Sequence, residues 1–218
     1  MSYYKLQIHL LSDTTFGRGD GVAGLLDREV EHDQYGFPYL RGRTLKGLIS
    51  EECDNLIATL PHNRPYWQSI AGDLFGRPGS TLDTIAAIHF GDACLPDDLR
   101  QAVAYQIKKN KFTRAEILDS LTTIRRQTSI HSETGVPDRG SLRTSRVIVR
   151  DLTFTANLNF AKTPSEDLLG LLSVGTKALR YLGSGRNRGL GHVRCTLSDH
   201  QNNPLTINLN HFFSPLEK

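Results

Sequence analysis

Residues 181–193, YLGSGRNRGLGHV, contain four glycines within nine positions: Gly183, Gly185, Gly189 and Gly191. Arg186 and Arg188 lie between them, a helical pattern precedes the segment, and a strand pattern follows it. The two common glycine-rich phosphate loops both follow a strand and open a helix, so this order of elements excludes them. One interpretation is a helix-to-strand turn with a C-cap glycine. Capping does not need four glycines. The other interpretation is therefore a loop whose backbone amides and arginine side chains contact an anion.

The spacing of apolar residues predicts an α+β chain. Strand patterns occupy residues 4–12, 84–93, 152–160 and 192–197. Helix patterns occupy residues 44–61, two segments within 96–123, and 165–182. Without residues 97–144 the order is β-α-β-β-α-β, the ferredoxin-like (RRM-like) fold class. We therefore expect one domain over residues 1–218, with residues 97–144 inserted between strands two and three.

Three further segments complete this reading. Residues 12–43 hold six glycines and little periodicity, which predicts a long irregular loop of the kind that often carries function. Residues 132–144 have the glycine and proline pattern of a hairpin. The C-terminal Leu205, Ile207 and Leu209 alternate as in an edge strand.

Charge is distributed unevenly along the chain. The 26 basic and 23 acidic residues give a net charge of only +3, but residues 108–150 hold ten Lys or Arg and four acids. This block would favour a polyanion. Three distant cysteines without a C-x-x-C pair suggest neither a disulfide framework nor a zinc knuckle, and they fit a reducing, cytoplasmic compartment. No apolar run approaches the roughly 20 residues of a membrane span, so no membrane partner is expected.

Two motifs in order carry a resemblance. Residues 36–49, GFPYLRGRTLKGLI, and the glycine segment, with the insertion between them, resemble the RAMP superfamily of CRISPR-associated proteins, specifically the type III effector backbone subunits. The resemblance implies a ferredoxin-like domain that holds guide (CRISPR) RNA and an inserted hairpin thumb that kinks it. It also implies target RNA and other CRISPR effector subunits as partners.

The resemblance and the residue types predict three groups of RNA-binding residues. At the start of the helix after the first motif, where an anion is favoured, they are Arg41, Arg43, Thr44 and Lys46. In the thumb, Val136 and Leu142 would wedge between bases and the phosphate contacts would be Arg139, Arg143 and Arg146. In the glycine segment they are Gly183, Gly185, Arg186, Arg188, Gly189 and Gly191. The alternatives are an ordinary basic helix start, an exposed hairpin and a flexible turn.

The loop of residues 24–33 contains Asp27, Glu29, Glu31 and Asp33. Such a run of acids is commonly a solvated surface. In the catalytic subunits that the chain resembles, an aspartate here and an acid six positions later support cleavage of target RNA, and Asp27 and Asp33 match them. The implied endoribonuclease would use a divalent metal at Asp27, Mg²⁺ or Mn²⁺, and no organic cofactor. The carboxylate would hold the ion or help the 2′-hydroxyl attack.

Three other functions stay open. The chain could be a non-catalytic guide-binding or capping subunit, or a stand-alone CRISPR repeat-processing endonuclease that uses a histidine such as His192. A nucleotide-phosphate enzyme is disfavoured by the order of elements.

Overall fold

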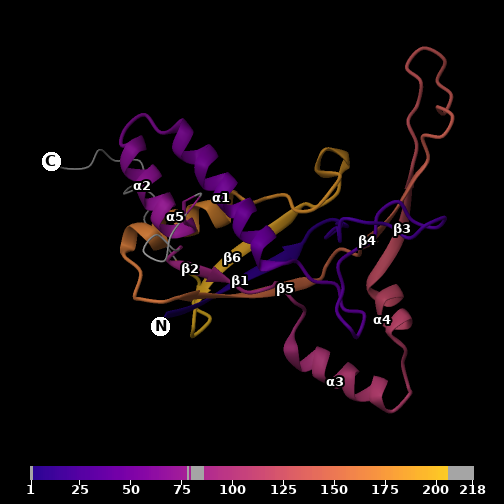
Figure 1. Ribbon diagram of the computed structural model, residues 1–218, viewed down its shortest axis with the longest axis horizontal. Coiled ribbons are helices and arrows are strands. Elements are labelled where there is room, and N and C mark those ends of the chain that lie inside the picture. The colour runs from indigo at the N-terminus through magenta and orange to yellow at the C-terminus, as the bar shows by residue number, and fades with distance from the viewer. Residues whose placement is uncertain (1, 78, 80–85, 206–218) are drawn as a thin grey trace.

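Four strands form the predicted antiparallel sheet. The computed structural model describes residues 2–77, 79 and 86–205, and Figure 1 labels its elements. The strands are β1 (Ser2–Leu10), β2 (Ile88–Phe90), β5 (Thr153–Phe160) and β6 (Val193–Asp199). Their order in the sheet is β2-β5-β1-β6, and each neighbouring pair is antiparallel. This order is the ferredoxin-like arrangement that the sequence predicts.

The core lies between one face of this sheet and three helices. Leu6, Ile8 and Leu10 of β1 are fully buried on that face, as the alternation predicts. The helices are α1 (Gly42–Thr59), α2 (Arg64–Phe75) and α5 (Glu166–Ala178). A Cβ at Gly175 of α5 would lie 2.3 Å from the sulfur of Cys53 in α1, so the glycine allows these helices to approach closely. None of the helices in the described ranges has the length and hydropathy of a bilayer span.

Several boundaries differ from the expected ones. Helix α2 was not expected, and its Trp67 is buried in the core. The strand expected over 84–93 is only β2 in the described part, and residues 80–85 lie outside it. Most of the expected C-terminal edge strand also lies outside the described residues, but the amide of Leu205 donates to the carbonyl of Leu197 (2.9 Å).

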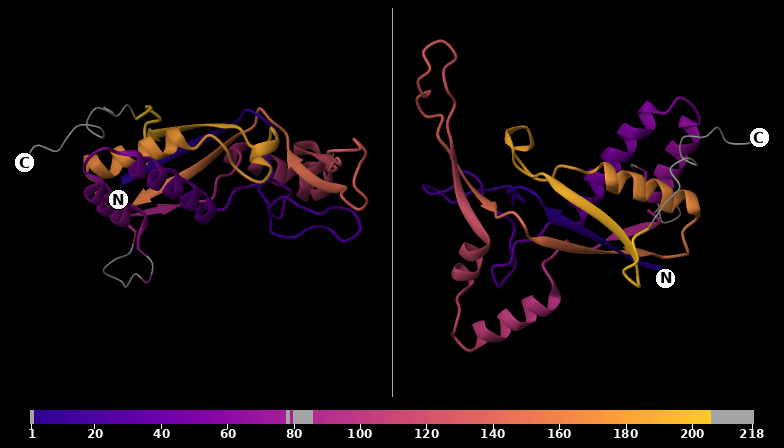
Figure 2. Two further views of the ribbon diagram at one scale, coloured as in Figure 1. Left: turned by 90° about the horizontal axis from the view of Figure 1, so that it is seen from above. Right: turned by 180° about the vertical axis from the view of Figure 1, so that it is seen from behind.

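Four elements lie between β2 and β5 in the chain and outside the four-stranded sheet. They are α3 (Asp97–Lys108), α4 (Arg114–Leu121), β3 (Thr122–Gln127) and β4 (Arg143–Ile148). The predicted capping box of Thr113 and Glu116 opens α4. Strands β3 and β4 pair from Thr122↔Ile148 to Gln127↔Arg143, so the hairpin is longer than its sequence pattern indicates. Figures 1 and 2 show its tip extending away from the sheet.

The irregular loop predicted over residues 12–43 occupies residues 11–41, where it joins β1 to α1 and contains isolated bridges but no helix or strand. Thr14 bridges Ile148, and Arg28 bridges Ser145, so the loop lies against β4. Leu40 bridges Ala93, which ties its other end to the chain after β2. The loop therefore fastens the hairpin to the core.

Candidate nucleic-acid interface

The glycine loop, residues 181–193, turns the chain from α5 to β6. Its glycines all have left-handed φ angles: +76° at Gly183, +82° at Gly185, +74° at Gly189 and +77° at Gly191. A Cβ at Gly183 would lie 2.3 Å from the carbonyl oxygen of Thr15. At Gly191 it would lie 2.0 Å from the carbonyl oxygen of Leu182. Backbone conformation and contact with the chain's own backbone therefore require glycine at both ends of the loop.

Some amides of the loop already have partners within the fold. The bonds run from Ser184 to the carbonyl of Thr15 (3.4 Å), from Arg188 to that of Gly185 (2.8 Å) and from Gly191 to that of Asp13 (2.8 Å). The expected convergence of bare amides on an anion is thereby limited to the other amides of the loop. Its arginine side chains are the groups with the most freedom to contact a phosphate.

A first cavity opens on this loop. It has a volume of about 470 Å³ and is lined by residues 183–188 and by Arg28 from the loop before α1. Arg28, Arg186 and Arg188 all line it, and no Asp or Glu is among its described lining residues. A cavity with three cations and no anion attracts negatively charged ligands.

A second cavity adjoins the first at Arg188, which lines both. Its volume is about 590 Å³, and the other lining residues come from the hairpin: Gln127, Thr128, Ser129, Ser141 and Arg143. The Arg188 guanidinium donates to the side-chain oxygen of Gln127 at 3.4 Å, which joins the glycine loop to the end of β3. Through Arg188 the polar lining extends from the glycine loop to the base of the hairpin tip.

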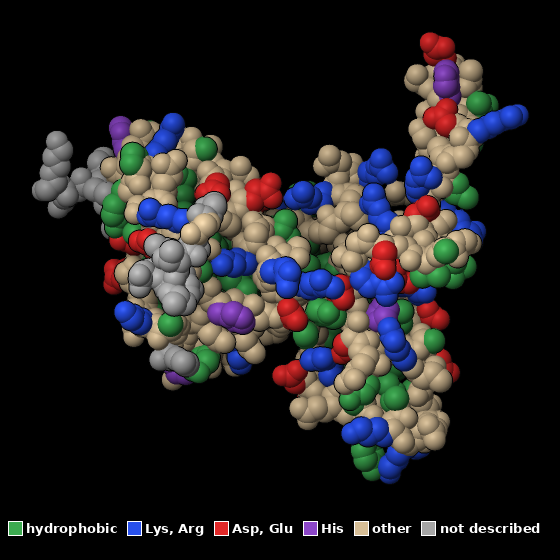
Figure 3. All heavy atoms as spheres, viewed as in Figure 1, with side chains coloured by type: hydrophobic (Ala, Val, Ile, Leu, Met, Phe, Trp, Pro, Cys, Tyr) green, Lys and Arg blue, Asp and Glu red, His purple; other side chains and the backbone are tan. Residues whose placement is uncertain are grey.

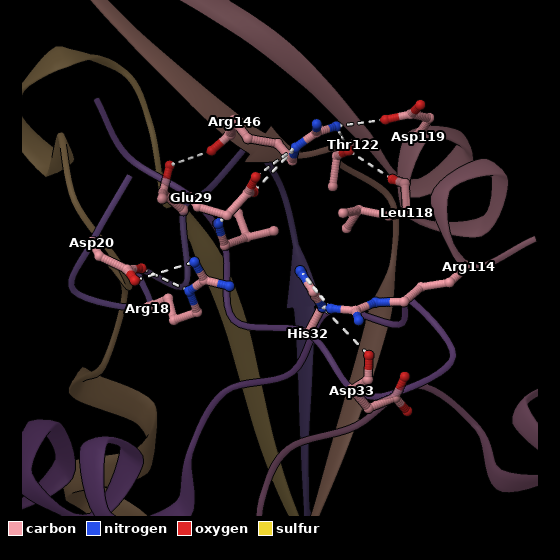
Figure 4. Close-up of polar contacts among 12 residues, drawn as sticks. Arg18, Asp20, Glu29, His32, Asp33, Arg114, Leu118, Asp119, Thr122 and Arg146 are labelled. Atoms are coloured by element: carbon pink, nitrogen blue, oxygen red, sulfur yellow. Dashed lines mark hydrogen bonds and ion pairs between the residues drawn. The ribbon is translucent and has the colours of Figure 1, made fainter. Parts of the chain in front are cut away.

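The three predicted hairpin arginines differ in their surroundings. Arg143 lines the second cavity, and Arg139 is exposed in the tip. Arg146 instead turns inward, where its guanidinium pairs with Glu29 (3.1 Å) and Asp119 (2.7 Å). Figure 4 shows these side chains pointing toward one another. In this structure Arg146 holds the hairpin to the loop. Val136 and Leu142 are 56% and 58% exposed, as a base-wedging role would require.

Two of the four acids in the loop of residues 24–33, Glu29 and Glu31, are buried and are not part of a solvated surface. Glu29 is buried against Arg146, and its carboxylate also accepts the amide of Val30 (2.8 Å). Glu31 is buried too, and it accepts the hydroxyl of Tyr39 (3.0 Å). A buried carboxylate needs such partners, and removing one partner of a buried pair typically costs about 3–5 kcal/mol. These acids hold the loop in place.

Asp27 and Asp33, the two predicted catalytic acids, have different environments. Asp27 is exposed, and its carboxylate accepts the amide of Thr144 (2.6 Å) while its own amide donates to the carbonyl of Thr144 (2.8 Å). Asp33 accepts the amides of Tyr35 and Phe37 (2.9 and 3.0 Å). Its second oxygen pairs with an arginine of α3, Arg100, at 2.9 Å. Asp33 thus closes a turn, whereas Asp27 is anchored to β4 and still open to solvent.

The start of α1 is less free for an anion than its sequence indicates. Arg41 pairs with Glu31 at 2.7 Å, and the carboxylate of Asp92 accepts the first helical amide, that of Gly42, at 2.7 Å. A carboxylate of the chain therefore lies at the positive end of the helix. Among the other predicted contacts here, Arg43 and Thr44 are exposed, and burial lowers the pKa of the Lys46 ammonium.

The two motifs that carry the resemblance lie at opposite edges of the four-stranded sheet. Gly42 packs on the backbone after β2, and the glycine loop leads into β6, and these are the two edge strands of the sheet. Three strand spacings, about 14 Å, separate the edges. That both motifs grip one ribose-phosphate strand stays a prediction, and a strand that contacts both would have to extend across the sheet.

Basic side chains are exposed on the face of the molecule that Figure 3 shows. Figure 3 shows Lys and Arg across the middle of that face and over the base of the hairpin, with carboxylates between them. Part of this mixture is the ion pairing described above. The exposed arginines without a carboxylate partner in the described part of the chain are the ones available to a polyanion, and they include Arg28, Arg43, Arg143, Arg186 and Arg188.

Sequence reasoning missed two residues of this interface. Arg28 lines the first cavity, but its position in an acidic run gave no basic signal. Asp13 joins three elements: its carboxylate pairs with Arg125 of β3 (2.5 Å) and accepts the amide of Arg150 (3.2 Å), and its carbonyl accepts the amide of Gly191. No pattern in the sequence could reveal contacts between positions so far apart.

Comparison with known proteins agrees with the fold and the two motifs. The family model of the RAMP superfamily matches residues 7–194. Similar solved structures include a chain of the type III-B Cmr-beta bound to cognate target RNA (TM-score 0.64) and one of its apo state (TM-score 0.65). Each is 14% identical in sequence, and each alignment covers 90% of this chain and 97% of the other. No protein of curated function matches the sequence. Since the family model spans most of its length, the chain belongs to the RAMP superfamily.

Proposed function

We propose that this chain is a guide-RNA-binding backbone subunit of a type III CRISPR ribonucleoprotein and that it cleaves paired target RNA with Asp27. The observation that carries the proposal is the position of Asp27. It is an exposed carboxylate, anchored at Thr144, and the next residue in the chain lines the arginine-rich cavity of the glycine loop. The two similar Cmr-beta structures, one of them bound to target RNA, support the same assignment.

Guide RNA would follow the path formed by the two adjoining cavities. Arg186 and Arg188 would contact its phosphates at the glycine loop, and Arg143 would do so at the hairpin. The exposed Val136 and Leu142 in the tip would contact bases. Other effector subunits would flank this one in the particle.

The surroundings of Asp27 fit a metal that is only partly held by protein. Among the described residues no group of three potential ligands occurs. Mg²⁺, however, is commonly bound by one or two carboxylates together with substrate phosphates. Thr144 engages one oxygen of Asp27, which leaves the other for Mg²⁺ or Mn²⁺. Such an ion would stabilise charge on the phosphoryl oxygens. Asp27 itself would orient or deprotonate the 2′-hydroxyl that attacks.

Substitution of Asp27 by Asn in the assembled particle tests the proposal. We expect target cleavage to fall by about 10²- to 10⁴-fold, the contribution typical of a positioned acid–base group, with RNA affinity unchanged. Asp20→Asn is the matched control, because Asp20 is an exposed acid of the same loop that pairs with Arg18 (2.6 Å). Cleavage by Asp27→Asn at the parental rate, with equal RNA binding, would refute the catalytic role.

A non-catalytic backbone or capping subunit is the second candidate. It is favoured by the engagement of Asp33 with Arg100 and with two amides of its turn, which leaves no second free acid at the predicted position. Under this function the parent particle would bind guide and target RNA through the same arginines, and cleavage would be equal in the parent and Asp27→Asn.

A further inference from the structure

Arg28 stands apart from the other arginines of the loop before α1. Arg18 pairs with Asp20, and Arg41 with Glu31, but Arg28 has no carboxylate partner for its side chain in the described part of the chain. Instead it borders the cavity of about 470 Å³ whose other lining residues all belong to the glycine loop, residues 183–188.

The backbone holds Arg28 firmly in this place. Its carbonyl accepts the amide of Arg146 (3.0 Å), and it forms a bridge with Ser145 of β4. On one side of it Asp27 is bonded to Thr144, and on the other Glu29 is buried. Because the neighbouring residues are fixed, the exposed Arg28 side chain lies beside the glycine loop before a ligand binds. The loop does not need to become ordered on binding, which lowers the entropic penalty of a contact.

The charges of the cavity favour binding of an anion with several phosphates. Arg28, Arg186 and Arg188 border it without a lining carboxylate, so the three cations repel one another until an anion lies between them. Arg188 also borders the second cavity, which continues the path to Arg143. A single phosphate would fill one part of this path, whereas a nucleic-acid backbone places phosphates along all of it.

We propose that Arg28 is an RNA-binding residue that holds a backbone phosphate against the glycine loop, directly beside Asp27 in the chain. This inference rests on the proposed RNA-binding function and adds a contact to it. Two adjacent residues of the loop before α1 then have different roles: Asp27 takes part in cleavage, and Arg28 binds the RNA strand.

The test measures binding of single-stranded RNA to the full chain and to Arg28→Ala over a range of salt concentrations. Loss of one phosphate contact should make the log–log salt slope shallower by about 0.7 and weaken binding about fivefold at 0.1 M salt. Arg18→Ala is the matched control, because it removes the same charge from the same loop at a side chain that is already paired. It should bind RNA within about twofold of the parent, since exposed paired charges contribute little.

The possible outcomes separate this inference from the function on which it rests. If the parent binds RNA and Arg28→Ala retains the parental slope, Arg28 is not a contact and the inference fails alone. If the parent does not bind RNA, the proposed function fails as well. Inorganic phosphate serves as competitor: displacement of RNA by phosphate at equal phosphate concentration would identify a free-anion site and overturn the inference.

Discussion

At the scale of single residues, the arginines of this chain divide by their partners. Arg146 is largely buried and paired with two carboxylates, and it holds the hairpin to the loop. Arg28 and Arg186 are exposed and border a cavity without acids. Because a paired guanidinium must lose its carboxylate before it binds phosphate, the unpaired arginines are the better candidates for RNA contacts. Residue type alone does not separate the two groups.

The glycines of the glycine loop allow a prediction about the stability of the fold. Gly191→Ala should destabilise the fold more than Gly189→Ala. Both positions have positive φ, which costs an alanine about 1–2 kcal/mol. Only at Gly191 would the added Cβ also collide with a carbonyl, that of Leu182, whereas Gly189 has nothing within 4 Å. Urea unfolding of the two variants and the parent measures the difference. Equal midpoints for both variants would show that the backbone contact is absent in solution.

At the scale of elements, the hairpin and the loop before α1 form one unit. The loop bridges β4 at Thr14 and Arg28, and Asp13 pairs with Arg125 of β3. Most of the tip, residues 128–142, is by contrast exposed. The base of the hairpin therefore contributes to the fold, and the tip is available for a ligand.

Replacing residues 128–142 by Asn-Gly separates these roles. The register pairs Gln127 with Arg143, so a two-residue type I′ turn can close the strands. We expect the melting temperature to stay within a few degrees of the parental value, because the removed side chains are mostly exposed. RNA binding should weaken, with a salt slope shallower by about 0.7 for loss of Arg139. Parental affinity in the truncated chain would argue against a thumb role for the tip.

The sequence predicted the elements better than their contacts. Period-two alternation located β1, β5 and β6, and the capping box located α4, because these signals are local. Helix α2 lacks a comparable signal, and β2 has only three residues. The sequence proposed candidate site residues where a motif carried them, as in the glycine loop. Arg28 and the Asp92 cap on α1 were not proposed, since their roles arise from contacts between distant positions. The single domain and the proposed catalytic acids stay predictions.

At the scale of the whole molecule, the basic residues lie along an extended path rather than in one pocket. The start of α1 and the glycine loop flank opposite edges of the sheet, and the loop before α1 runs between them. A ligand that uses both ends must itself be extended. This geometry favours a nucleic-acid strand over a nucleotide or a small anion.

Salt dependence tests this extended contact. If Arg28, Arg43, Lys46, Arg186 and Arg188 each contact a phosphate of single-stranded RNA, the log–log slope should be about −3.5. Arg43→Ala should lower affinity, whereas Arg41→Ala should mainly lower stability, because Arg41 is the partner of the buried Glu31. A nearly flat salt dependence of the parent would contradict an extended backbone contact. A larger loss of RNA affinity in Arg41→Ala than in Arg43→Ala, at equal stability, would contradict the division into paired and free arginines.

The adjacency of Asp27 and Arg28 has a consequence for where a target would be cut. Consecutive Cα atoms are about 3.8 Å apart, and both residues are bonded to β4. A phosphate held by one side chain and a bond attacked near the other would keep a constant separation. The distance between successive cleavage sites would then equal the distance between neighbouring subunits. The lengths of the products would not depend on the base sequence of the target.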